Sequence, residues 1–322
     1  MMSPLMEQDY DLDDEKIAVS ELLKARDVPE KSGDNLLIET WNIKKLGSKG
    51  ARKRRRKDHE LIAELIKPFD IVATQEVMPD LWGIREIMES LDERFKMITT
   101  DVGGNSERLV YIYDSSRVKT RELFAEIAIP ESDLRRYDPP DIRRRFKGFN
   151  RNPFIVSFER SEINFTLANV HIYFGNESGV EYMKRLVEVH ALAKWADIQS
   201  RSGTAYDKDI ILIGDMNVPK MDQSDKVYIQ LTRYGYEPTN WSTKVGTNLS
   251  GTDHYDQIAI TPEFDQRLKR STQGVLNFDK HLFRSIWERN DLDPDSDSDL
   301  KKWQKYCETR ISDHRPLWVE FS

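Results

Sequence analysis

The sequence predicts a layered α/β (α+β) protein whose sheets contain both parallel and antiparallel strands. From residue 36 onward, short apolar runs alternate with amphipathic segments, which is the pattern of strands interleaved with helices. Two neighbouring runs, 153–158 and 164–171, are close enough in sequence to pair as a hairpin, so part of the structure is expected to be antiparallel. We find no tandem repeat and no second domain boundary in the 322 residues.

The individual elements follow from the spacing of the apolar side chains. Runs rich in branched and aromatic residues predict strands at 36–41, 70–74, 109–113, 154–158, 164–171, 210–213, 255–260 and 317–321. Apolar residues at intervals of three or four predict helices at 58–67, 79–91 and 180–198, with a weaker helical stretch at 17–26. The longest of these helices carries its apolar stripe at Leu186, Val189, Leu192, Ala193 and Ala196.

The first part of the chain differs from the rest in charge. Residues 1–35 contain ten acidic and four basic side chains, whereas the whole chain has a net charge of −7. We therefore expect a partly flexible acidic N-terminal arm over residues 1–35, followed by one domain over residues 36–322. The rest of the chain is nearly neutral, which excludes a globally basic nucleic-acid binder but allows local basic patches.

Composition also restricts the cellular setting. The single cysteine, Cys307, excludes an intrachain disulfide and a metal cluster built on several thiolates. No apolar run approaches the ~20 residues that cross a bilayer, and the N-terminus lacks the pattern of a secretory signal. These observations predict a cytoplasmic protein without a membrane partner.

Polar side chains gather where the predicted strands end. Carboxylates, amides and histidines follow four of the strands and precede the last one, at Asn42, Gln75-Glu76, Asn169-Val170-His171, Asp215-Met216-Asn217 and Asp313-His314. Strands disfavour Asn and Asp, so this recurrence predicts a polar site at one edge of the sheets. Each residue alone also fits a turn, a helix terminus or a buried histidine.

Taken in order, these segments resemble the endonuclease/exonuclease/phosphatase superfamily, and most closely its deoxyribonuclease I-like branch. The matching segments are Glu39-Thr40-Trp41-Asn42-Ile43, Ile71-Val72-Ala73-Thr74-Gln75-Glu76-Val77, Glu107-Arg108-Leu109-Val110-Tyr111-Ile112-Tyr113, Phe149-Asn150-Arg151-Asn152-Pro153-Phe154, Ala168-Asn169-Val170-His171, Ile213-Gly214-Asp215-Met216-Asn217, Tyr255-Asp256-Gln257-Ile258 and Ile311-Ser312-Asp313-His314-Arg315-Pro316. The resemblance implies a four-layer αββα sandwich of two mixed, largely antiparallel sheets flanked by helices. It also implies a divalent cation and phosphoester hydrolysis.

The resemblance further implies a role for each matched residue. Glu76 corresponds to the principal metal ligand, with Asn42 and Asp313 close to the same ion. Carboxylate and amide oxygens suit a hard cation, so we expect Mg²⁺, with Mn²⁺ able to substitute. The implied catalytic residues are a pair that orients water and phosphate and two histidines, each held by a carboxylate: Asp215, Asn217, His171 with Glu107, and His314 with Asp256.

Two basic clusters bear on the substrate. The first basic cluster, residues 49–57, holds seven cations and closely follows Asn42, and the second basic cluster consists of Arg135, Arg136, Arg143, Arg144, Arg145 and Lys147. Both could bind phosphates beside the scissile bond, although the first also fits a solvated face or a nuclear-localisation run. The expected phosphate-binding residues are Arg52, Arg54, Arg55, Arg108, Arg143, Arg144, Arg145 and Arg151. We also expect the acidic arm to fold back onto these clusters and compete with DNA.

The sequence therefore predicts a Mg²⁺-dependent phosphodiester hydrolase, a DNA endonuclease of little sequence specificity. The resemblance implies products with 3′-hydroxyl and 5′-phosphate ends. RNA as a substrate remains open, as does the same chemistry on a phosphoinositide, a sphingolipid or a small phosphate ester. A catalytically inactive binding module is a third alternative. The acidic run at 291–299 lacks the glycine and terminal glutamate of a calcium loop, so we expect a solvated loop there.

Overall fold

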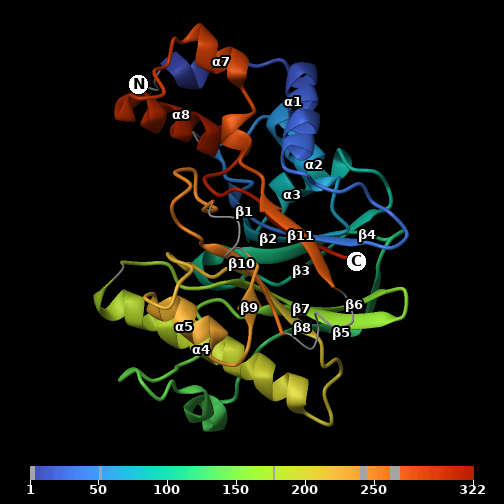
Figure 1. Cartoon of the computed structure of the whole chain (residues 1–322), viewed down its shortest axis with the longest axis vertical. Coiled ribbons are helices and arrows are strands. Elements are labelled where there is room, and N and C mark those ends of the chain that lie inside the picture. Colours follow the sequence, from blue (N-terminus) through green and yellow to red (C-terminus); the bar gives the residue numbers. More distant parts are fainter. Residues whose placement is uncertain (1–3, 51–52, 177, 240–244, 262–268) are drawn as a thin grey trace.

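The computed structural model describes all residues except 1–3, 51–52, 177, 240–244 and 262–268. Two six-stranded sheets pack face to face, and helices cover the outer face of each sheet (Figure 1). Sheet A has the order β11 (Arg270–Val275), β12 (Leu317–Phe321), β1 (Leu36–Leu46), β2 (Ile71–Val77), β4 (Arg108–Asp114), β3 (Phe95–Thr99). Sheet B has the order β5 (Lys119–Glu126), β6 (Phe154–Arg160), β7 (Ile163–His171), β8 (Ile210–Asp215), β10 (Asp256–Ile260), β9 (Glu237–Pro238). The predicted αββα sandwich is confirmed.

Each sheet contains one parallel pair at its centre. In sheet A this pair is β1 with β2, and in sheet B it is β7 with β8. The other neighbouring strands of both sheets are antiparallel, including the predicted hairpin of β6 and β7. The sheets are therefore mixed and largely antiparallel.

The helices form the two outer layers. Those on the side of sheet A are α1 (Leu12–Ala25), α2 (Arg56–Ile66), α3 (Trp82–Glu89), α7 (Arg284–Arg289) and α8 (Asp297–Arg310), and those on the side of sheet B are α4 (Gly179–Arg201) and α5 (Lys226–Thr232) (Figure 1). Short 3₁₀ helices lie at Pro4–Glu7, Gly104–Ser106, Glu131–Tyr137 and Phe278–Lys280. Among the described residues, no helix combines the length and the apolar character that a membrane crossing requires.

The core has an apolar layer between the sheets and one beneath each helical layer. Strand β1 has apolar residues on both of its faces. Leu36 and Ile38 point into the layer between the sheets, whereas Leu37 and Trp41 point toward the helices. Both faces of the strand are buried, so the alternation of polar and apolar residues that marks a half-exposed strand is absent.

The N-terminal arm lies against the helical layer of sheet A (Figure 1). Its helix begins at Leu12 rather than at residue 17, because the Asp11 side chain caps the first turn. Asp9 forms ion pairs with Arg55 and Lys57, so the arm contacts the first basic cluster. Its described residues therefore belong to the same packed body as the domain.

Several elements were not predicted from the sequence. The strands β5 and β11 lie at sheet edges, where polar and charged side chains are tolerated because one side of the strand faces solvent. The acidic run at 291–299 is a loop only as far as Ser296, whose hydroxyl accepts a hydrogen bond from the backbone of Asp299. Helix α8 therefore begins inside the run that the sequence analysis assigned to a loop.

Candidate active site

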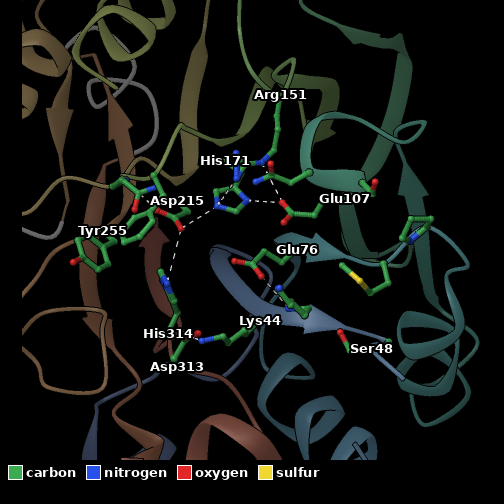
Figure 2. A pocket seen from close by; sticks show the side chains of 18 of the residues that line it. Lys44, Ser48, Glu76, Glu107, Arg151, His171, Asp215, Tyr255, Asp313 and His314 are labelled. Carbon is green, nitrogen blue, oxygen red and sulfur yellow. Dashed lines mark hydrogen bonds and ion pairs between the residues drawn. The ribbon is translucent and has the colours of Figure 1, made fainter. Parts of the chain in front are cut away.

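The topology brings the polar strand ends to one edge of the sandwich. In sheet A the parallel strands β1 and β2 carry Asn42 and Glu76 toward this edge, and in sheet B β7 and β8 end there with His171 and Asp215. Figure 2 shows Glu76, His171 and Asp215 together at this edge. Strand β10 runs antiparallel to β8, and its first residue, Asp256, pairs with Asp215. Strand β12 likewise runs antiparallel to β1, which places His314 at the same edge. The sequence-predicted residues therefore meet although they come from six different strands or strand ends.

These side chains surround an open hollow of about 890 Å³. Its lining includes Glu76, Glu107, Arg151, His171, Asp215 and His314, with Phe174 and Tyr255 at its border. Figure 2 shows that Arg151 and Glu107 lie on one side of the hollow and that Lys44 and Asp313 lie on the other. The hollow therefore has cationic, anionic and aromatic walls.

Asn42 is buried and connects the two sheets through two residues that line the hollow. Its amide nitrogen donates hydrogen bonds to Oε1 of Glu76 (3.1 Å) and to Oδ2 of Asp215 (3.0 Å). Its own oxygen, Oδ1, is buried without a hydrogen-bond partner. Buried acceptors are normally satisfied, and a hard cation bound beside the Glu76 carboxylate would satisfy this one. The donor set thus fits a divalent cation.

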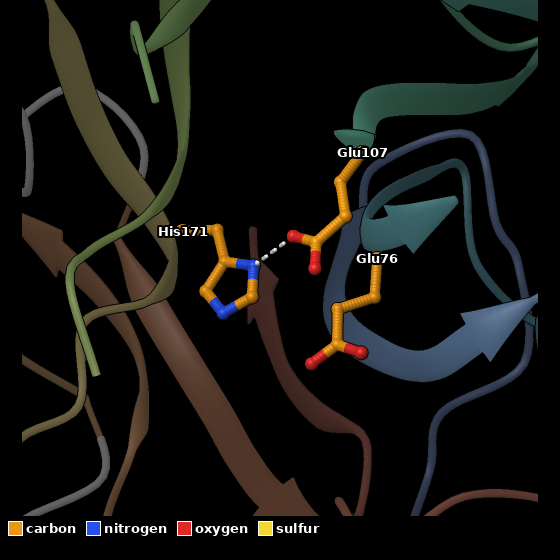
Figure 3. Close-up of side chains that lie close together, drawn as sticks. All are labelled: Glu76, Glu107 and His171. Atoms are coloured by element: carbon orange, nitrogen blue, oxygen red, sulfur yellow. Dashed lines mark ion pairs between the residues drawn. The ribbon is translucent and has the colours of Figure 1, made fainter. Parts of the chain in front are cut away.

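Two observations refine where a cation could sit. One carboxylate oxygen each of Glu76 and Glu107 and one ring nitrogen of His171 lie within 4.8 Å of one another (Figure 3). Asp313, by contrast, forms an ion pair with Lys44, which Glu308 also contacts at 3.0 Å. The structure therefore groups Glu76 with Glu107 and His171, and it balances the charge of Asp313 with an ammonium group.

The first histidine is held by Glu107. Nδ1 of His171 lies 3.1 Å from Oε2 of Glu107, and Nε of Arg151 donates to the same oxygen at 3.1 Å. Burial raises the pKa of Glu107, but contact with His171 and the charge of Arg151 hold it below its usual value. Glu107 is therefore ionised and fixes the orientation of the imidazole ring, with Nε2 directed toward Asp215 at 3.6 Å.

The second histidine has a similar carboxylate partner. Nδ1 of His314 lies 2.8 Å from Oδ2 of Asp256, and its Nε2 lies 4.0 Å from Oδ2 of Asp215. Burial alone would lower the pKa of His314, but the charges of Asp256 and Asp215 raise it to about 10. For the carboxyl of Asp215 the directions are reversed. Burial alone would raise its pKa, but the charges of His314 and His171 lower it below its ordinary value. Asp215 is therefore a buried carboxylate between two imidazole groups.

The Gly-Asp-x-Asn segment has a local structural cause. Gly214 has a φ of +132°, and a Cβ atom there would overlap the carbonyl oxygen of Val170 on the neighbouring strand. The absence of a side chain lets β7 and β8 approach where they carry His171 and Asp215. Asn217, with φ of 51°, donates its backbone N–H to Asp215 and its side-chain amide to Ile172.

Sequence analysis missed Glu188, which lies on α4 behind the active site. Its Oε1 accepts the backbone N–H of Asn150 (3.1 Å), and its Oε2 accepts that of Tyr173 (3.2 Å). Burial raises the pKa of Glu188 to about 7. The carboxyl thus ties together the segments that carry Arg151 and His171. The sequence offered one signal for this residue. Glu188 directly precedes Val189 of the predicted apolar stripe, so a buried glutamate could have been expected there.

The predicted phosphate-binding arginines have different environments. Arg151 lines the hollow, and its Nη2 lies 3.1 Å from Nε2 of His171. The structure does not support the prediction for Arg54, which is buried and donates to the carbonyl oxygens of Ile311 and Lys44. Arg108 likewise donates to the carbonyls of Pro79 and Thr100.

The other described arginines of this set do not line the hollow. Arg55 forms ion pairs with Asp9 and Asp58, so its charge is balanced by the arm and by α2. Arg52 lies outside the described residues. From the second basic cluster, Arg144 and Arg145 line a separate hollow of about 220 Å³ with Lys147 and Lys184, whereas Arg143 is exposed.

Comparisons with known proteins agree with this architecture. No family model matches the chain. A deoxyribonuclease of Thioalkalivibrio sp. (strain K90mix) is 27% identical over 308 residues, which cover 91% of this chain and 73% of that protein. Two sheets between helical layers, with carboxylates and histidines at one edge, define an αββα sandwich.

Solved structures share this fold. An endonuclease/exonuclease/phosphatase family protein from Bacteroides thetaiotaomicron is 16% identical with a TM-score of 0.55, over 89% of this chain and 94% of that one. A mannosyl-6-phosphatase from the same species is 17% identical (TM-score 0.58, 89% and 99% covered). D. rerio TDP2 complexed with single-strand DNA product is 14% identical (TM-score 0.54, 89% and 99% covered). The chain has the endonuclease/exonuclease/phosphatase fold.

Proposed function

We propose that this protein is a Mg²⁺-dependent phosphodiesterase that cuts DNA internally with little sequence specificity. The observation that carries the proposal is the convergence of two histidine–carboxylate pairs on Asp215, beside Glu76 and the unsatisfied oxygen of Asn42. A relative named as a deoxyribonuclease and a TDP2 structure with a single-strand DNA product favour a nucleic acid as the substrate.

Glu76, Asn42 and Asp313 would hold the cation, with Glu107 and His171 facing the same space. When bound, a divalent cation polarises a phosphoryl oxygen and lowers the pKa of a bound water. Glu76 has a φ of 58°, a conformation that non-glycine residues rarely adopt, and it accepts the backbone N–H of Lys45. The backbone therefore directs this carboxylate into the hollow, and the resemblance of the sequence favours Mg²⁺, with Mn²⁺ as a substitute.

The protein's own groups manage protons and negative charge. His171 and His314 each have Nδ1 against a carboxylate. Nε2 of His314 is thereby directed toward a phosphate oxygen or a departing alkoxide, whereas Nε2 of His171 contacts Arg151 at 3.1 Å. Asp215 and Asn217 would orient the attacking water, since the Asp215 carboxylate lies between the two rings. Arg151 places a buried guanidinium beside His171, where it would neutralise a phosphate oxygen.

Plasmid nicking tests this proposal. Supercoiled DNA is incubated with the protein in Mg²⁺, in Mn²⁺ or in EDTA, and the nicked circle is quantified. We expect EDTA-sensitive nicking that falls by about 10²–10⁴-fold in Asp215→Ala, because a group that positions the reactants is lost. Asp295→Ala is the matched control, since it removes an exposed carboxylate from the loop before α8.

A phosphomonoester substrate is the second candidate, favoured by the likeness to a mannosyl-6-phosphatase. The same preparations are assayed for phosphate release from a sugar phosphate and from phosphoinositide vesicles. Turnover there, together with the absence of DNA nicking in either metal, would replace the endonuclease proposal. An Asp215→Ala protein that nicks DNA at the wild-type rate would contradict the assignment of the site.

A further inference from the structure

A second hollow opens beside the active site, on the side of sheet A. Its volume is about 620 Å³, and its lining is Lys49, Gly50, Lys53, Asp80, Trp82 and Arg85. Lys49 and Asp80 also line the active-site hollow, so the two spaces are contiguous. We call this second space the Trp82 hollow. Its size and position allow a nucleotide that is joined to a phosphate in the active site to extend into it.

The walls of the Trp82 hollow are held together by close packing. A Cβ atom on Gly83 would lie 2.5 Å from the backbone nitrogen of Gly47, so the segment after β1 rests directly on the start of α3. His59 of α2 contacts the indole of Trp82 edge-on, with ring centroids 5.1 Å apart. The indole therefore has a fixed place beside the segment that carries Lys49.

Lys53 and the indole form a cation–π contact. The ammonium nitrogen of Lys53 lies 4.9 Å from the centroid of the Trp82 ring. An exposed lysine is held there weakly, since such contacts contribute ~0.5–1 kcal/mol at exposed sites. A nucleobase can therefore take its place on the ring while the ammonium moves to an adjoining phosphate.

The hollow also has an excess of positive charge. Lys49, Lys53 and Arg85 contribute three cations, and the one acid in the lining, Asp80, pairs with Lys49 at 2.9 Å. Within the described residues, neither Lys53 nor Arg85 is in an ion pair. The neighbouring Arg54 and Arg55 are engaged elsewhere, and among the described residues of the first basic cluster Lys49 and Lys53 line this space.

We propose that the Trp82 hollow binds an unpaired nucleotide adjoining the scissile phosphate, with its base stacked on Trp82 and its phosphates held by Lys49, Lys53 and Arg85. The inference rests on the proposed nuclease function and specifies its substrate. A base inside a duplex is already stacked on both faces and reaches the indole only after it leaves the helix. The protein therefore prefers single-stranded or locally unpaired DNA to fully paired DNA.

The first test compares a polymer with a small ester. kcat/KM is measured for a short single-stranded oligonucleotide, for its duplex and for bis(p-nitrophenyl) phosphate, which carries neither a nucleobase nor a second phosphate. Trp82→Ala is expected to lower the ratio of single-strand to small-ester kcat/KM by about 5- to 150-fold, the effect of losing one stacked base. Trp82→Phe should restore most of the ratio, and Lys301→Ala on the exposed face of α8 is the matched control.

The second test measures binding alone. Fluorescence anisotropy with a fluorescein-labelled single-stranded oligonucleotide in EDTA is compared for the wild type, Trp82→Ala and Lys53→Ala. Weaker binding by both variants supports the subsite. An unchanged kcat/KM ratio and unchanged binding in Trp82→Ala would overturn it, as would an equal loss on the small ester. Binding that depends on Trp82 without any DNA cleavage would overturn the proposed function and leave the subsite standing.

Discussion

Replacing Glu188 by glutamine tests how the fold holds the segments that carry Arg151 and His171. The Glu188 carboxyl is buried and accepts two backbone N–H groups, and burial raises its pKa from 4.5 to about 7. A difference of this size corresponds to about 3 kcal/mol between the two protonation states. The folded protein therefore resists ionisation of this group, and the resistance is measurable as a pH dependence of stability.

The direction of the effect follows from proton linkage. Below pH 4.5, Glu188 is protonated in both the folded and the unfolded chain, and above pH 7 it is ionised in both. Between these values the unfolded chain has released the proton while the folded chain retains it, so the free energy of unfolding falls as the pH rises. Glutamine cannot ionise, so Glu188→Gln lacks this contribution at every pH.

The assay is urea unfolding of both proteins in EDTA between pH 4 and pH 8, followed by tryptophan fluorescence. The free energy of unfolding of Glu188→Gln minus that of the wild type should rise by about 3 kcal/mol from pH 4.5 to pH 7. All other titrating groups are common to the two proteins and cancel in the difference. Glu162→Gln, at an exposed position between β6 and β7, should give a difference without this rise. A flat difference for Glu188→Gln would refute the reasoning.

Three further changes probe the site and its supports. Gly214→Ala should lower the melting temperature and the yield of folded protein, because the new methyl group overlaps Val170 and φ of +132° is strained for alanine; circular dichroism on heating measures this. Arg151→Ala should destabilise the protein by about 3–5 kcal/mol in urea unfolding, because Glu107 loses its buried cationic partner, and Arg151→Lys should recover part of the loss. Glu76→Gln should weaken Mn²⁺ binding in calorimetry by at least ~10-fold, and equal heats for variant and wild type would remove Glu76 from the metal site.

The position of the candidate site at one edge of the sandwich could be predicted from the sequence. The central strands carry apolar residues on both faces because both faces are buried. Of the polar residues that follow these runs, Glu76, His171 and Asp215 line the hollow, and Asn42 is buried beside Glu76 and Asp215. Asp256 and His314 could be paired in advance only through the family resemblance, since 58 residues separate them along the chain.

The basic residues could not be assigned in this way. Arg54 and Lys53 are adjacent in a run of cations, yet Arg54 is buried against Ile311, 257 residues away, while Lys53 lies over Trp82. Local sequence cannot distinguish these two outcomes, because they depend on which carbonyl groups the fold leaves without donors. Lys184 was missed for the same reason, since α4 brings it beside Arg144 only in three dimensions.

The order of the strands has a consequence for refolding kinetics. Sheet B is formed by one continuous stretch of chain, from β5 to β10. Sheet A combines β1 to β4, which precede that stretch in the sequence, with β11 and β12, which follow it. Asn35 and Glu320, which are hydrogen-bonded beside this junction, are 285 residues apart. Contacts of such long range form slowly, because much of the chain must be ordered first. His314 lies three residues before β12, so the proposed nuclease activity should return after dilution from denaturant only as fast as sheet A closes.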